Sequence, residues 1–258
     1  MSHYRLLLEY DGTDFSGWQY QKGCRTVQDE IEKAIEIFTK ERIRVTGAGR
    51  TDAGVHASGQ VVSLELAGHP EPVRLSHAMN GILPRDVRVL SAAECDPSFN
   101  ARRRASGKRY RYRILNRSAS AAILRGFVFH CPRHLDIPAM KEASGLFKGE
   151  HDFSAFRASN CECEHAVRKI FECDVSVEKD NLLTIDVSAT AFVKNMVRIM
   201  AGTILEVGWG ARSIESVSEA LRQGERGLAG VTAPPHGLVL EKVFYGEWPS
   251  SGIEWPGI

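Results

Sequence analysis

Four glycines lie within thirteen residues, from Gly47 to Gly59, in the stretch VTGAGRTDAGVHASGQVVSLEL. So many glycines are typical of a turn, because glycine adopts backbone conformations that other residues avoid. Immediately afterwards Val62, Leu64 and Leu66 alternate with neighbours on the other face, which is the two-residue period of a strand. The stretch therefore predicts a glycine-rich turn that leads into a β-strand.

Similar strand–helix–strand patterns occur in both halves of the 258-residue chain. In the first half, a strand is predicted over Tyr4–Tyr10, and a helix begins after Thr26 in a T-x-x-D pattern that resembles a capping box. In the second half, Lys108–Asn116 alternates strictly, and residues 166–189 have the pattern of a hairpin with its turn at Lys179–Asn181. The repetition suggests an internally duplicated fold, although no repeat of fixed period supports it.

We therefore predict an α+β fold of two similar α/β halves, each with a largely antiparallel, mixed sheet and flanking helices. The expected domains are 1–105, which carries the glycine-rich turn, and 106–258. A chain of this length can bury a core in one large domain or in two smaller ones. Further helices are expected over 75–83, over 136–149 with Asp136 as N-cap, over 192–208 and after Ser213, and further strands over 86–94 and 237–246.

Composition argues against several classes of protein. The net charge is +1, so any site for a polyanion must be local. The first residues, MSHYRLLLEYDG, lack a secretory signal, and no apolar stretch approaches the roughly 20 residues of a membrane span. Six cysteines are too few for a disulfide scaffold of this length. We expect a cytoplasmic protein with no membrane partner, and without a P-loop or G-x-G-x-x-G we expect no nucleotide cofactor.

A basic segment runs from Arg102 to Arg117, with eight lysines or arginines in sixteen residues and no acid. On a strand, Arg109 and Arg111 would line one face, with the tyrosines on the other. An aromatic face beside a cationic face suits RNA, because bases stack on rings and phosphates meet guanidinium groups. The alternative is a solvated strand surface. Replacing Arg109, Arg111 and Arg113 together should, on the RNA interpretation, weaken binding and flatten its salt dependence.

Two further charged residues allow more than one interpretation. Arg198 lies in a very apolar helix, where it either extends its head to water or meets a carboxylate or phosphate. Asp52 either caps its own turn or offers a carboxylate to a bulky ligand that the surrounding glycines admit. In the second case Arg50 or Arg198 would keep Asp52 ionised, as a nucleophile or base requires. Composition and spacing leave both alternatives open.

A metal site is disfavoured. The sequence CECEH, Cys161 to His165, with Cys173 downstream, offers soft ligands. However, C-x-C is not the usual zinc spacing, and no second ligand pair is near in sequence. These residues are interpreted as incidental thiols, and no metal is predicted.

The segment GRTDAGVHASGQV, Gly49–Val61, closely resembles the signature of the tRNA pseudouridine synthase A family. Asn100 stands where the family pattern F-H-A-R-F has histidine, and Lys194 and Asn195 replace residues that are often histidine or arginine. These departures concern RNA contacts and leave the expected reaction unchanged. The resemblance covers nearly the whole chain through further blocks in the family's order: YDGTDFSGWQYQ, TVQDEIEKA, LPRDVRV, FNARRRASGKRYRYRI, GEHDFSAFR, FVKNMVRIMAGTILEVG and APPHGLVLEKVFY.

This resemblance implies a pseudouridine synthase fold with a central basic cleft, in a homodimer whose partner is tRNA. The implied reaction isomerises uridine to pseudouridine at positions 38, 39 and 40 of the anticodon stem-loop, with no cofactor. Alternatives are a non-catalytic RNA-binding module, a synthase for other RNA uridines, and a metal-dependent hydrolase using the cysteines.

The resemblance also implies roles for particular residues. Asp52 is the expected catalytic aspartate and nucleophile; attack on the sugar, attack on the base and removal of a sugar proton all stay open. Arg50 displaces the target base as it flips out. Tyr110 stacks on the uracil, and Arg198 pairs with Asp52. The residues expected to contact the substrate are Tyr110, Arg50, Arg102, Arg109 and Arg111.

Overall fold

The computed structural model describes the chain except residues 162, 249–252, 254 and 257–258. It packs as two compact units: unit 1 is Met1–Gly107 together with the chain from Leu240 onward, and unit 2 is Lys108–Val239. The expected boundary after residue 105 lies close to the one between the units. The expected second domain, however, ran to residue 258, whereas the last strand belongs to unit 1 from Leu240.

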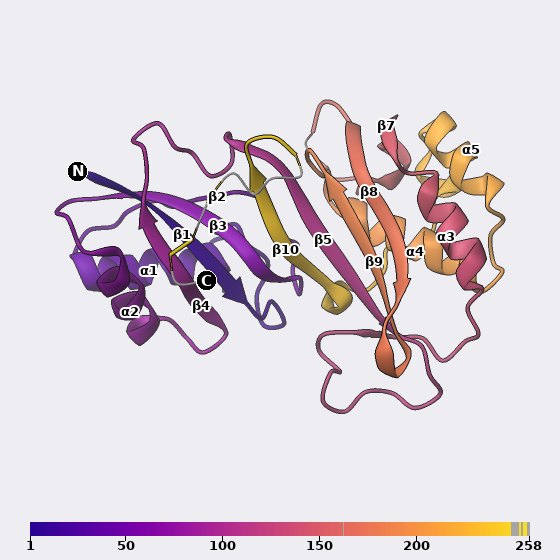
Figure 1. Cartoon of the computed structure of the whole chain (residues 1–258), viewed down its shortest axis with the longest axis horizontal. Coiled ribbons are helices and arrows are strands. Elements are labelled where there is room, and N and C mark those ends of the chain that lie inside the picture. Colours follow the sequence, from indigo (N-terminus) through magenta and orange to yellow (C-terminus); the bar gives the residue numbers. More distant parts are fainter. Residues whose placement is uncertain (162, 249–252, 254, 257–258) are drawn as a thin grey trace. The chain divides into compact units, whose positions relative to one another are not determined.

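Unit 1 is a sheet with two helices beside it, and the strand pairs β1/β3 and β1/β4 in it are antiparallel (Figure 1). Its strands lie in the order β4-β1-β3-β10, and the short β2 pairs with β3. The strands are β1 (Ser2–Tyr10), β2 (Thr46–Gly47), β3 (His56–Leu66), β4 (Val87–Glu94) and β10 (Leu238–Tyr245). The helices are α1 (Val27–Thr39) and α2 (Pro72–Ile82).

Local sequence accounts for the main elements of unit 1. The side chain of Thr26 accepts a hydrogen bond from the N–H of Asp29, so it is the N-cap of α1, as predicted. The helix ends at Lys40, whose left-handed φ of 63° breaks the helical path. Every second residue of β1 from Tyr4 to Tyr10 is buried, which supplies one wall of the core.

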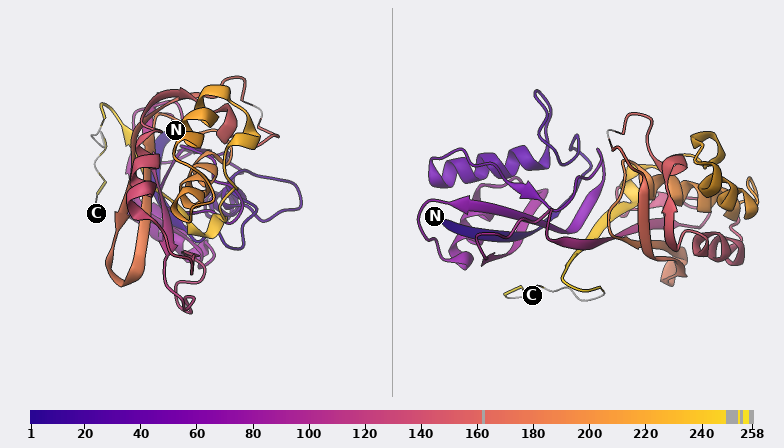
Figure 2. Two further views of the ribbon diagram at one scale, coloured as in Figure 1. Left: turned by 90° about the vertical axis from the view of Figure 1, so that its right-hand side faces the viewer. Right: turned by 90° about the horizontal axis from the view of Figure 1, so that it is seen from above.

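Unit 2 has a sheet in the order β5-β9-β8-β7, with the short β6 parallel to β5. Figure 2 shows its helices on one face of this sheet. The strands are β5 (Ala105–Leu115), β6 (Phe129–His130), β7 (Gly149–Asp152), β8 (Val167–Val177) and β9 (Leu182–Ala189). The helices are α3 (Ile137–Gly145), α4 (Met196–Gly208) and α5 (Glu215–Gln223), with 3-10 turns at Ser154–Phe156, Lys179–Asn181, Arg226–Leu228 and Pro235–Gly237.

The predicted α+β class is confirmed, with a mixed but mostly antiparallel strand arrangement. The predicted N-cap Asp136 accepts a hydrogen bond from Ala139 N–H at 2.9 Å. Three helix boundaries differ by three residues or more: α2 begins at Pro72 and not at 75, and α3 ends at Gly145 and not at 149. The apolar pattern from residue 192 predicted a helix over 192–208, but α4 begins at Met196. Asn195 has a φ of 63°, outside the helical region, so the helix cannot extend back through it. Within the described residues, no helix is long and apolar enough to cross a membrane.

Candidate active site

The turn that carries Asp52, residues 47–56, is held by the loop that follows β1, residues 11–18. We call these segments the aspartate turn and the anchor loop. A Cβ atom added to Gly12 would lie 2.1 Å from the carbonyl oxygen of Val55 in the aspartate turn. A Cβ atom added to Gly17 would lie 2.8 Å from the carbonyl oxygen of Thr51. The two backbones therefore approach more closely than any side chain at these glycines would permit.

Hydrogen bonds also cross between the anchor loop and the aspartate turn. They run from Trp18 N–H to Thr51 O at 3.1 Å, from Gly54 N–H to Phe15 O at 3.3 Å and from Gly12 N–H to His56 Nδ1 at 3.0 Å. Inside the turn, Val55 N–H donates to Asp52 O at 3.1 Å. The backbone on both sides of Asp52 is thus fixed by partners distant in sequence.

Two buried polar side chains from the flanking strands support the turn. The Tyr10 hydroxyl, at the end of β1, lies 2.8 Å from the Thr51 hydroxyl. Burial raises the pKa of Tyr10 to about 12, although hydrogen bonds with Thr51 and Gln60 oppose the shift. From β3, the Gln60 amide donates to Gly49 O at 2.8 Å. Neither Tyr10 nor Gln60 is predicted from the sequence, because the only signal for each is a place on an inward strand face.

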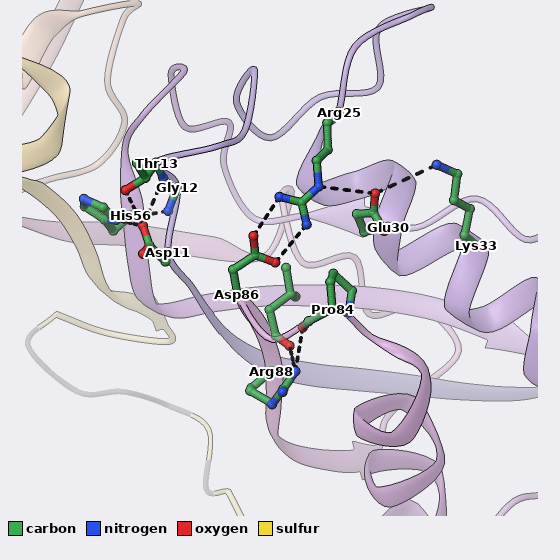
Figure 3. Close-up of polar contacts among 11 residues, drawn as sticks. Asp11, Gly12, Thr13, Arg25, Glu30, Lys33, His56, Pro84, Asp86 and Arg88 are labelled. Atoms are coloured by element: carbon green, nitrogen blue, oxygen red, sulfur yellow. Dashed lines mark hydrogen bonds and ion pairs between the residues drawn. The ribbon is translucent and has the colours of Figure 1, made fainter. Parts of the chain in front are cut away.

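His56 links the end of the aspartate turn to the anchor loop (Figure 3). Its buried Nδ1 lies 3.1 Å from Asp11 Oδ1 and 3.0 Å from the N–H of Gly12. An unprotonated Nδ1 accepts a hydrogen bond from the N–H of Gly12, whereas a protonated Nδ1 donates one to the carboxylate of Asp11. One protonation state of Nδ1 therefore cannot satisfy both contacts. Burial raises the pKa of Asp11, but hydrogen bonds from Thr13 and the nearby His56 outweigh it and leave the pKa below its ordinary value.

The aspartate turn presents two of the predicted residues differently. Arg50 is exposed, whereas Asp52 is only partly accessible. An exposed arginine two positions from a half-buried carboxylate can reach a ligand that approaches the turn. Both residues lie in unit 1, and the other two predicted catalytic residues, Tyr110 and Arg198, lie in unit 2.

In unit 2 the basic strand β5 has two distinct faces, as predicted. Tyr110, Tyr112 and Ile114 are buried, while the arginines between them are partly exposed. Tyr110 is 6% exposed, and its ring meets Phe192 edge-on at 4.9 Å between centroids. The tyrosine that the resemblance identified therefore lies on the buried face of the sheet.

The arginine face of β5 is matched by carboxylates on the neighbouring strands. Arg109 contacts Ser188 Oγ at 3.1 Å and Glu172 Oε2 at 2.5 Å. Arg111 binds both oxygens of Asp186, at 2.7 and 3.0 Å. These bidentate and bridging contacts are the strong kind of charged hydrogen bond. The local positive charge that the basic segment showed in sequence is thus partly neutralised by β8 and β9.

Other arginines of the basic segment precede β5 in a tight turn. The Asn100 side chain accepts from the N–H groups of Arg102 and Arg103 at 3.1 and 3.0 Å. The turn is also held by Tyr245, whose hydroxyl donates to Ala101 O at 2.9 Å. Arg102 and Arg103 are exposed. Asn100, the departure from the family's histidine, therefore orders the turn that presents these two arginines.

Arg198, in the first turn of α4, donates to acceptors on either side of it in the sequence. Its Nε donates to Ala233 O at 2.8 Å, and its Nη1 donates to the side-chain oxygen of Asn195 at 3.0 Å. The Tyr112 hydroxyl is close to Arg198 and donates to Pro234 O at 3.0 Å. Burial raises the pKa of Tyr112, and the positive charge of Arg198 lowers it by a smaller amount. Asn195, a second departure from the family, thus orients the guanidinium group.

The predicted absence of a metal site rests on spacing alone. Cys173 is fully buried in β8, whereas Cys163 is exposed. Among the residues that the structure describes, no three His, Cys, Asp or Glu side chains are grouped to hold a metal ion.

Comparisons with known proteins place the chain in a family. The family described as tRNA pseudouridine synthase matches residues 7–102 and 143–246. The tRNA pseudouridine synthase A of Myxococcus xanthus is 44% identical over 249 residues, which covers 96% of this chain and 94% of the relative. Proteins of the same name from Acetivibrio thermocellus and Geobacillus sp. are 42% and 45% identical, covering 95% and 93% of this chain and 100% and 97% of the relatives.

A solved structure, that of the archaeal box H/ACA sRNP Nop10-Cbf5 complex, aligns with 80% of this chain and 44% of its own at 15% identity. The TM-score of this alignment is 0.35. Asp52, Arg50 and Arg198 fall inside the segments that match the family, and Tyr110 falls between them. The extent of the family match and the identity to these relatives show that the chain belongs to the tRNA pseudouridine synthase family.

Proposed function

We propose that this chain isomerises uridine to pseudouridine at positions 38, 39 and 40 of the tRNA anticodon stem-loop, with Asp52 as its catalytic aspartate. As a family member, it is an isomerase that acts on uridine in tRNA. The observation that carries the role of Asp52 is its setting: a carboxylate in a glycine-rich turn that two strands and the anchor loop hold in place. A positioned, partly accessible carboxylate suits nucleophilic or base catalysis.

The reaction needs three events at one nucleotide. The bond from N1 to the sugar breaks, the uracil turns while held, and C5 forms the new bond and loses its hydrogen. We assign Arg50 to displacing the base from the stem, since its side chain is exposed beside Asp52. Tyr110 would stack on the uracil, and Arg198 would keep Asp52 ionised, because both are already oriented by packing or hydrogen bonds.

Release of tritium from C5 of uridine tests the proposed sites directly, because the new C5 bond expels that hydrogen. We expect release from unmodified tRNA carrying uridine at 38, 39 or 40, and none when cytidine replaces all three. Undiminished tritium release from the tRNA with cytidine at positions 38, 39 and 40 would show that other uridines are the targets. Binding without release from any substrate would instead favour a non-catalytic RNA-binding module.

The proposal includes a homodimer, which the family resemblance implies, and a cytoplasmic location, which the composition of the chain favours. A dimer would let one tRNA contact both chains. Sedimentation of the protein with and without tRNA tests this point, and a monomer that retains full activity would remove the dimer from the proposal.

We expect exposed arginines to dominate phosphate binding. Arg102→Ala with Arg103→Ala should flatten the salt dependence of tRNA binding by about one unit of slope per arginine, because each exposed guanidinium releases counterions. Arg109→Ala with Arg111→Ala is the matched pair. It should change the slope less and lower stability more, since these groups bind Glu172 and Asp186. Equal slopes for both pairs would show that the ion-paired face also meets phosphate.

Asn195 is expected to matter through Arg198. Asn195→Gly keeps the left-handed backbone without strain but removes the side-chain oxygen that accepts from Arg198. We expect its turnover to fall about 10- to 100-fold, because a misplaced catalytic group is costly, while its Tm stays near that of wild type. Asn195→Asp retains an acceptor and should keep most of the activity. Full activity in Asn195→Gly would mean that the Asn195 side chain is not needed to orient the guanidinium.

A further inference from the structure

Arg25 and Asp86 form an ion pair beside the anchor loop (Figure 3). Arg25 lies in the stretch that joins the anchor loop to α1, and Asp86 lies just before β4. Arg25 Nη1 donates to Asp86 Oδ2 at 2.7 Å, and Arg25 Nη2 donates to Asp86 Oδ1 at 2.9 Å. This bidentate contact fixes the direction of the guanidinium group as well as its position.

The ion pair contacts the anchor loop at two places. Near the middle of the loop, the Arg25 guanidinium carbon lies 4.1 Å from the centre of the Phe15 ring, which is a cation–π contact, and the N–H of Ser16 donates to Arg25 O at 2.8 Å. At the start of the loop, the N–H of Asp11 donates to Asp86 O at 3.0 Å. The two residues therefore hold the first half of the anchor loop at both of its ends.

Phe15 connects the ion pair to the aspartate turn. Its side chain is buried, and its carbonyl oxygen accepts a hydrogen bond from the N–H of Gly54 at 3.3 Å. Gly54 lies two residues after Asp52 in the turn. A continuous series of contacts thus joins the ion pair to the turn that carries the proposed catalytic carboxylate.

The ion pair is accessible to water, which separates a local role from a global one. The side chain of Arg25 is 36% exposed and that of Asp86 is 25% exposed. Ion pairs this exposed add little to the stability of a fold, because water and salt compete for both charges. Loss of the pair should therefore leave the protein folded but release the anchor loop, and a displacement of about 1 Å at a catalytic group can slow a reaction about 100-fold.

A second carboxylate near Arg25 provides a control. Glu30, in the first turn of α1, has its Oε1 3.7 Å from Arg25 Nε and 3.9 Å from Lys33 Nζ. These distances are too long for hydrogen bonds, so Glu30 supplies negative charge without fixing the guanidinium group. Glu30→Gln thus removes a carboxylate next to Arg25 and leaves the bidentate contact in place.

We propose that Arg25 and Asp86 are positioning residues for pseudouridine formation, because their ion pair fixes the anchor loop and, through Phe15, the aspartate turn. This inference rests on the proposed role of Asp52. Neither side chain of the pair has to touch the substrate, so loss of the pair should lower kcat and leave KM for tRNA near its wild-type value. Arg25 and Asp86 should also act as one unit, since each holds the other in place.

A double-mutant cycle tests the pair through tritium release from tRNA labelled at C5 of uridine, at a temperature where every variant is folded. We expect Arg25→Gln and Asp86→Asn each to lower kcat about 10-fold, with KM within about twofold of wild type. The double variant should also lose about 10-fold rather than about 100-fold, because the second change removes nothing further. Glu30→Gln should keep the wild-type kcat.

Three results of this cycle would overturn the proposal. A loss in the double variant equal to the product of the two single losses would show that Arg25 and Asp86 act independently. Wild-type kcat in both single variants would show that the aspartate turn does not need the pair. A raised KM at unchanged kcat in Arg25→Gln would mean that this guanidinium group binds tRNA phosphate instead.

Hydrogen exchange tests the connection from the ion pair to the aspartate turn without relying on activity. In the peptide that covers this turn, we expect Asp86→Asn to speed exchange about 10-fold, because the N–H of Gly54 loses its fixed acceptor. Glu30→Gln should leave that exchange rate unchanged, and a peptide from α5 in unit 2 should exchange alike in all variants.

The exchange measurement also separates this inference from the proposed function. An unchanged rate at the aspartate turn in Asp86→Asn would overturn the connection, whatever the activity. Faster exchange there, in a protein whose wild type releases no tritium, would support the connection and count against the proposed function.

Discussion

Asp52→Asn is expected to abolish tritium release from tRNA labelled at C5 of uridine, lowering the rate by at least about three orders of magnitude. Asparagine has the same shape but neither attacks the sugar or base nor removes a proton. The main-chain bond from Val55 N–H to residue 52 O persists, so the aspartate turn keeps its path. Binding of tRNA should stay within a few-fold of wild type, because the phosphate contacts lie elsewhere.

Asp14→Asn is the matched control, since Asp14 is an exposed carboxylate in the anchor loop that packs against the same turn. It should retain wild-type activity. Activity retained in Asp52→Asn would remove this residue from its role. An equal loss in both variants would mean that the anchor loop, and not the Asp52 carboxylate, limits the reaction.

Local features of the fold were predictable because their causes lie a few residues apart. Thr26 and Asp136 cap α1 and α3 through groups three positions away, and β5 alternates because its backbone is extended. The short strands β2, β6 and β7 were not predictable. Each has two to four residues and exists only because a distant strand offers it a partner.

The candidate site shows the same limit. The motif predicted Asp52 and Arg50, but not Tyr10, whose support of the aspartate turn depends on a partner 41 residues away. The basic segment contains no acid, yet the carboxylates that bind Arg109 and Arg111 come from 63 and 75 residues further along the chain. Charge read along the sequence therefore overstates the charge that the folded surface presents.

Gly12→Ala is expected to damage both stability and activity. The new methyl group would lie 2.1 Å from Val55 O and 2.5 Å from Val55 C, both backbone atoms, so the anchor loop and the aspartate turn must separate. We expect the free energy of unfolding to fall by about 3 kcal/mol, the cost of overpacking a rigid contact. For a chain of this size, Tm should fall by roughly 6–12 °C.

The effect on turnover follows from the same displacement. Moving the aspartate turn by about 1 Å should slow tritium release about 100-fold, even at a temperature where the variant is fully folded. Gly81→Ala in α2 is the matched control, because among the described residues no heavy atom beyond its chain neighbours and the backbone of its own helix lies within 4 Å of the added Cβ. It should leave the rate unchanged and stabilise the helix by about 0.5–1 kcal/mol. If the folded Gly12→Ala variant released tritium at the wild-type rate, the position of Asp52 would not depend on the anchor loop. Strands β1 and β3, which carry Tyr10 and Gln60, would then be sufficient to hold the aspartate turn.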